Sequence, residues 1–71
     1  MERKFIVSIE QEDFLANSGP LTLKTCLKWA GALRHLTKVK VTIRDAADYK
    51  NYKVYSSVED LEAEFDKGIK I

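Results

Sequence analysis

The sequence predicts an α+β fold, in which a small antiparallel sheet built on a hairpin has helices packed on one face. Two segments, 4–9 and 38–44, alternate apolar and polar residues as half-buried strands do. Residues 23–36 place apolar side chains at helical spacing, and a Ser-x-x-Glu pattern at Ser56 opens a second helix. The expected order is β-α-β-β-α, with or without a short strand at 69–71.

The length of 71 residues predicts one small domain, 1–71. A chain of this size buries only about 60% of the surface that its unfolded form exposes. Disulfides, metals or oligomerisation often add stability to such small folds. Cys26 is the only cysteine, so an internal disulfide is excluded.

The first residues, MERKFIVSIEQED, hold a short apolar run between charged residues. The run is too short for a signal peptide or a membrane span. We therefore expect a cytoplasmic protein that does not bind membranes.

The first strand, 4–9, places Phe5, Val7 and Ile9 on one face. We expect residues 11–16 to form a short helical turn. Pro20 suits the first turn of the following helix, because a helix does not need a hydrogen bond from the N–H at that position. The apolar pattern predicts that this helix runs from Leu23 to about Leu36.

Strands at 38–44 and 51–56 flank the turn residues 45–50, a pattern typical of a β-hairpin. We expect Asp45 to pair with Lys50 across a four-residue loop. Slipping by one pair would set Arg44 opposite Lys53, and an odd slip would turn every apolar residue outward. On the buried face, this choice sets Ile43 and Val41 opposite Tyr52 and Val54. On the other face it sets Thr42 and Lys40 opposite Lys53 and Tyr55.

Ser56 and Glu59 form a capping box, which predicts a helix running to about Lys67. Its apolar stripe consists of Val58, Leu61 and Phe65. Gly68 is expected to end the helix in the left-handed conformation.

The predicted hairpin places several cations on the sheet face that the helices leave open. This arrangement favours nucleic-acid contact through Lys38, Lys40, Arg44 and Lys53 on phosphates, with Tyr55 stacking on a base. The simpler interpretation is a solvated face, because antiparallel sheets often leave one side in water. Both interpretations remain open.

The alternative function is a protein-interaction or regulatory module, which also allows a homodimer. Residues 20–56 hold eight cations and two acids, whereas residues 57–66 hold five acids and no cation. The interaction surface is then either the acidic helix or an apolar edge. The residues concerned are Glu59, Glu62, Glu64 and Asp66 in the helix, and Phe14, Trp29 and Leu36 at the edge.

Catalysis is not expected. Cys26 and His35 lie nine residues apart on one predicted helix, about 180° around from each other, so they cannot cooperate as nucleophile and base. No phosphate-binding loop or metal-ligand spacing occurs in the sequence. We therefore expect a non-catalytic binding module with no cofactor, no metal site and no small-molecule substrate.

Overall fold

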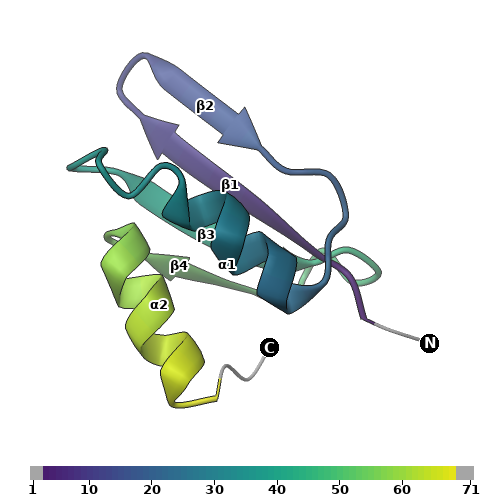
Figure 1. Ribbon diagram of the computed structural model, residues 1–71. Coiled ribbons are helices and arrows are strands. Elements are labelled where there is room, and N and C mark those ends of the chain that lie inside the picture. Colours follow the sequence, from purple (N-terminus) through teal and green to yellow (C-terminus); the bar gives the residue numbers. More distant parts are fainter. Residues whose placement is uncertain (1–2, 69–71) are drawn as a thin grey trace.

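The computed structural model describes residues 3–68, which form a four-stranded antiparallel sheet and two helices (Figure 1). The strand order across the sheet is β2-β1-β3-β4. The predicted α+β class is confirmed. The elements are, in chain order, β1 (Phe5–Gln11), β2 (Phe14–Asn17), α1 (Leu23–Gly31), β3 (Lys40–Asp45), β4 (Tyr52–Tyr55) and α2 (Val58–Asp66).

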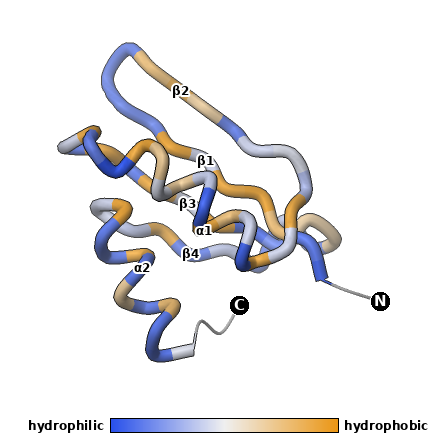
Figure 2. Tube along the Cα trace, viewed as in Figure 1, coloured by the Kyte–Doolittle hydropathy of each residue, from blue (hydrophilic) through white to orange (hydrophobic). Residues whose placement is uncertain are grey.

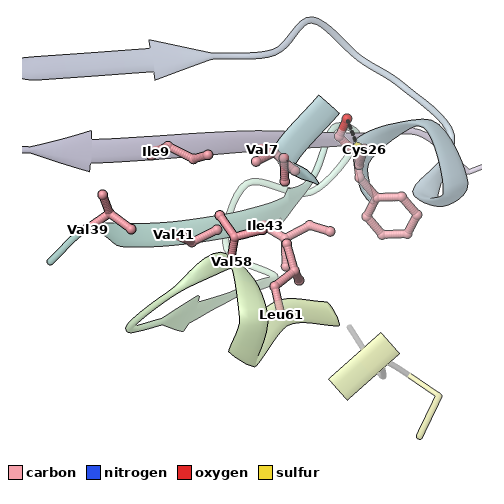
Figure 3. Close-up of a cluster of buried hydrophobic side chains, with 10 residues drawn as sticks. Val7, Ile9, Cys26, Val39, Val41, Ile43, Val58 and Leu61 are labelled. Carbon is pink, nitrogen blue, oxygen red and sulfur yellow. Dashed lines mark hydrogen bonds between the residues drawn. The ribbon is translucent and has the colours of Figure 1, made fainter. Parts of the chain in front are cut away.

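The core lies between the sheet and the two helices. Alternate residues of β1 and β3 are buried, as the period-two pattern predicted. Helix α1 packs on β1, α2 packs on β4, and the two helices touch each other. Figure 3 shows side chains from the central strands and α2 meeting in one cluster. Its buried members are Phe5, Val7, Ile9, Cys26, Ala30, Val39, Val41, Ile43, Val58 and Leu61.

The segment after β1 forms a strand, so the prediction of a short helical turn at 11–16 is wrong. Residues Glu12 and Asp13 make a two-residue turn, and Phe14–Asn17 returns beside β1 as strand β2. This turn has neither the glycine nor the asparagine that usually marks a tight hairpin. The strand is four residues long, and its FLAN sequence does not alternate. The local sequence therefore carried little signal for it.

Helix α1 is shorter than predicted, because it ends at Gly31 rather than near Leu36. The chain continues beyond Gly31 in tight turns, in which the Leu33 N–H donates to the Ala30 carbonyl at 2.9 Å. Thr22 caps the start of the helix, and its hydroxyl accepts a hydrogen bond from the Thr25 N–H. Pro20 lies before this cap, so its expected place in the first helical turn is also wrong.

The predicted register of the β3–β4 hairpin is wrong by one residue. Ile43 lies opposite Lys53 and Thr42 lies opposite Val54, so the two faces of β4 are exchanged.

Asp45 has different partners from those predicted. Its carboxylate accepts hydrogen bonds from the Arg3 guanidinium at 2.6 Å and the Ala47 N–H at 2.8 Å, instead of meeting Lys50. Its backbone N–H donates to the Asn51 carbonyl at 3.0 Å. Asp45 thus pairs with Asn51 across five residues, 46–50, rather than across four.

Helix α2 begins one residue later than the predicted capping box implies. Ser57, rather than Ser56, is the cap, and its hydroxyl accepts a hydrogen bond from the Asp60 N–H at 3.1 Å. Gly68 has a φ of 86°, which confirms the left-handed stop. The predicted strand at 69–71 lies outside the described residues.

Leu61 allows a test of the core. We expect Leu61→Ala to lower the free energy of unfolding by about 2–5 kcal/mol, because it leaves a cavity at a fully buried position. In urea denaturation the midpoint should fall while the slope stays constant. The matched control is Leu15→Ala, at a position that is 59% exposed, with an expected change within about 0.5 kcal/mol. Equal losses in the two variants would contradict the described core.

Candidate functional site

The sheet has one face under the helices and one face with no helix on it (Figure 1). Opposed residues in an antiparallel ladder point to the same side, so the registers define which side chains lie on the uncovered side. We call this side the open face. Its residues are Ile6, Ser8 and Glu10 of β1, Leu15 and Asn17 of β2, Lys40, Thr42 and Arg44 of β3, and Tyr52 and Val54 of β4.

Apolar surface is spread across the open face. Tyr52 is 49% exposed, Val54 is 48% exposed and Leu15 is 59% exposed. Ile6 lies between them and is partly buried. Ser8 and Thr42 occupy the centre of the sheet, and the Ser8 hydroxyl donates to Asn17 Oδ1 at 2.5 Å. The open face is therefore amphipathic rather than uniformly polar.

Arg44 is the best-defined charged group on the open face. Its guanidinium carbon lies 4.9 Å from the centroid of the Tyr52 ring, in a cation–π contact. Its Nε atom is buried and has no hydrogen-bond partner among the described residues. The ring contact holds the guanidinium in place, and the Nε–H donor of Arg44 is left without an acceptor among the described residues.

In the described chain, cations on the helix side of the molecule form ion pairs with carboxylates of α2, whereas those of the open face do not. Lys53, on the helix-covered side, contacts Glu64 at 2.7 Å. Arg34, after α1, contacts Glu62 at 2.8 Å. Within residues 3–68, no carboxylate forms an ion pair with Lys40 or Arg44. The open face therefore presents cations whose charge is not balanced by direct contact.

The residues predicted to contact nucleic acid do not form one surface. Lys40 and Arg44 lie on the open face as predicted. Lys53 and Tyr55 lie on the helix-covered side, so their predicted place beside Lys40 is wrong. Lys38 is exposed in the loop before β3, with a φ of 55°, and lines an open hollow at the tip of the β1–β2 hairpin.

Lys53, Glu64 and Tyr55 form a small polar cluster beneath α2. The hydrogen bond from Lys53 lowers the pKa of the Glu64 carboxyl and raises the pKa of the Lys53 ammonium group. Burial raises the pKa of the Tyr55 hydroxyl, and the nearby Glu64 carboxylate raises it further. The Lys53 and Glu64 side chains are both partly exposed, so this ion pair lies near solvent.

The residues predicted to contact a protein partner are divided among several places. Trp29 and Leu36 are partly buried and pack against the core, whereas Phe14 on β2 is 44% exposed. In α2, Glu59 and Asp66 are exposed. The other two acids of that set, Glu62 and Glu64, form the ion pairs described above. Two of the four predicted acidic contacts are therefore already paired within the chain.

The thiol of Cys26 lies in the core, where it donates to the Phe5 carbonyl at 3.4 Å (Figure 3). Burial raises the pKa of this thiol to about 11. His35 is exposed. Over residues 3–68, no group of three or more His, Cys, Asp or Glu side chains is placed to hold a metal ion.

Tyr52 and Val54 are the members of the open face that the sequence analysis assigned to the core. The segment YKVY has an apolar residue on each parity, so alternation alone cannot say which side is buried. The sequence of α2 does hold a clue to which side of β4 the helices cover. Its residue Glu64 supplies an ion-pair partner for Lys53 on the covered side.

Comparisons with models of known protein families, with curated proteins and with solved structures give no match to this chain. Neither helix in the described part of the chain is long and apolar enough to cross a membrane.

Asp45 provides a test of the electrostatics at the loop end of the β3–β4 hairpin. The hydrogen bond from Arg3 lowers the pKa of its carboxyl, with a further contribution from the Ala47 N–H. A lowered pKa in the folded state gives stability that is present above the unfolded pKa and is lost as the pH falls. We expect the free energy of unfolding to decrease below about pH 4, and Asp45→Asn to weaken this dependence.

The measurement is urea denaturation at a series of pH values from neutral to acid. Asp13→Asn is the matched control, because Asp13 is exposed in the β1–β2 turn. If Asp45→Asn left the acid dependence as steep as Asp13→Asn does, the role of Asp45 would be contradicted.

Proposed function

We propose that the protein is a non-catalytic protein-binding module, and that its open face binds a partner surface carrying apolar side chains next to a carboxylate. The observation that carries this proposal is the β3–β4 register. It places Tyr52 and Val54 on the uncovered side of the sheet, next to Arg44, which has no ion-pair partner within the described chain.

The apolar groups supply the driving force for association. Burial of apolar surface contributes about 25 cal/mol per Å², and half of each of these side chains is still in contact with water. The open face spans all four strands and carries Leu15 at one end and Tyr52 at the other. Tyrosine and arginine are also among the residues that most often dominate binding energy at protein interfaces.

Arg44 supplies the specificity for an anionic group. The Tyr52 ring holds the guanidinium over the sheet, which lowers the entropy lost when a partner binds. A guanidinium binds a carboxylate with two parallel hydrogen bonds. Lys40 lies four residues before Arg44 on the same side of β3 and adds positive charge, whereas Glu10, opposite Lys40, adds one negative charge. The balance favours a partner with a small number of carboxylates.

Nucleic-acid binding is the second candidate, because cations with no ion-pair partner among residues 3–68, beside an exposed aromatic ring, also suit phosphates and bases. The stacking residue in this version is Tyr52 rather than Tyr55. The open face holds only two strand cations, Lys40 and Arg44, together with Glu10. This weak positive charge is why we place protein binding first.

A displayed library of random peptides, selected on the full chain, tests the proposal. We expect enriched peptides to carry aspartate or glutamate beside apolar residues. The enriched peptide should perturb the backbone amide signals of 40–44 and 52–54. Arg44→Gln and Tyr52→Ser should each weaken its binding by about tenfold or more, because each removes an anchor of the interface. Tyr49→Ser is the matched control, at a position that is 64% exposed in the β3–β4 loop.

Two outcomes oppose protein binding at this face. Enriched peptides that perturb signals elsewhere, or that bind Tyr52→Ser as well as the original chain, would place binding at another surface. A labelled single-stranded oligonucleotide is the second probe. If it binds more tightly than any peptide, with affinity that falls steeply with salt and is lost in Lys40→Glu with Arg44→Glu, the second candidate replaces the first.

A further inference from the structure

We propose that β2 is a self-association edge, at which two copies of the chain pair their β2 strands antiparallel about a two-fold axis at Ala16. The two sheets then form one continuous sheet. This inference goes beyond the proposed function and does not depend on it, because it concerns backbone groups at the edge of the sheet rather than the side chains of its open face.

The backbone of β2 has donors and acceptors that point away from β1. The Ser18 N–H donates to the Val7 carbonyl at 2.8 Å, so even-numbered residues of this segment turn their backbone groups toward β1. By alternation, the N–H and C=O groups of Leu15 and Asn17 point outward. Figure 1 shows β2 along one margin of the sheet, away from both helices.

The chain limits the length of this free edge at both ends. The turn at Glu12 and Asp13 closes one end. At the other end the chain passes through Gly19 and Pro20, and Pro20 has no N–H to donate. It then rejoins β1 where Leu21 and Phe5 exchange backbone hydrogen bonds. The available edge is therefore Leu15–Asn17.

This short edge is complementary to itself. With Ala16 opposite Ala16 of the second copy, the N–H of Leu15 meets the C=O of Asn17 across the axis, and the N–H of Asn17 meets the C=O of Leu15. Symmetry repeats both contacts, which gives four hydrogen bonds. The small side chain of Ala16 allows the two strands to approach at the axis.

The composition of β2 distinguishes it from the other free edge. Soluble proteins commonly protect a free edge with a charged side chain or a proline. Residues 14–18 carry no charge and no proline, and Figure 2 shows most of β2 as hydrophobic. On β4, the equivalent two-fold pairing would set Lys53 opposite Lys53 of the second copy, and like charges in direct opposition destabilise a sheet. Self-pairing is therefore expected at β2.

Sedimentation equilibrium of the full chain, from about 10 μM to about 1 mM, measures the association. We expect a reversible monomer–dimer equilibrium within this range. Amide hydrogen exchange followed by NMR at the two ends of the range gives the location. Exchange at Leu15 and Asn17 should slow as the concentration rises, because those two N–H groups become hydrogen-bonded in the dimer.

Leu15→Pro removes an outward N–H and leaves the hydrogen bonds to β1 in place. It should weaken dimerisation by at least about tenfold, since each dimer loses two hydrogen bonds. Val54→Pro is the matched control, because the Val54 N–H points outward from β4 by the same alternation. It should leave the dimerisation constant within about twofold. If Leu15→Pro does not fold, as judged by circular dichroism, Leu15→Lys replaces it. This variant should also weaken dimerisation, because it places a charge on the free edge.

A strictly monomeric chain at about 1 mM would overturn the inference. So would a dimer that Leu15→Pro and Val54→Pro weaken equally. Exchange at Leu15 and Asn17 that does not depend on concentration would place any self-association at another surface.

Discussion

The register of β3 against β4 is the constraint on which the rest of the molecule depends. Because side chains alternate along a strand, one residue of register decides which face of β4 meets the helices. At the loop end of the hairpin, the Asp45 N–H donates to the Asn51 carbonyl, while the Asp45 carboxylate accepts hydrogen bonds from Arg3 and the Ala47 N–H. A shift of this register by one residue would exchange the side chains of β4 between the two sides of the sheet.

The same register separates the charges into two groups. On the covered side, Lys53 meets Glu64, and Arg34 meets Glu62 nearby. The basic segment 20–56 and the acidic helix α2 therefore neutralise each other in part. The charge counts of the sequence alone do not reveal this pairing. On the open face, Arg44 lies against Tyr52 instead of against a carboxylate. The open face thus combines half-exposed apolar side chains with cations that have no ion-pair partner in the described chain.

The parts of the fold that follow from local patterns could be predicted from the sequence. Both central strands alternate clearly and lie where expected, and the left-handed Gly68 ends α2. The parts that depend on distant contacts could not be predicted. Arg3 and Asp45 are 42 residues apart, and no local pattern identifies their ion pair, which occupies the Asp45 carboxylate that we expected to meet Lys50. The candidate site was therefore predicted for Lys40 and Arg44 on β3 but not for Tyr52 and Val54 on β4.

The open face and the free edge have a common origin in the size of the chain. Two helices of nine residues each cover one face of a four-stranded sheet, and the described residues supply nothing to cover the other face or the margin at β2. Leu15 belongs to both surfaces, because its side chain lies on the open face while its backbone groups point out from the edge. Pairing at β2 would therefore extend the open face across two copies and bring two sets of Arg44 and Tyr52 into one sheet. A partner that carries two linked target sites would then bind bivalently, which raises the apparent affinity without any new contact.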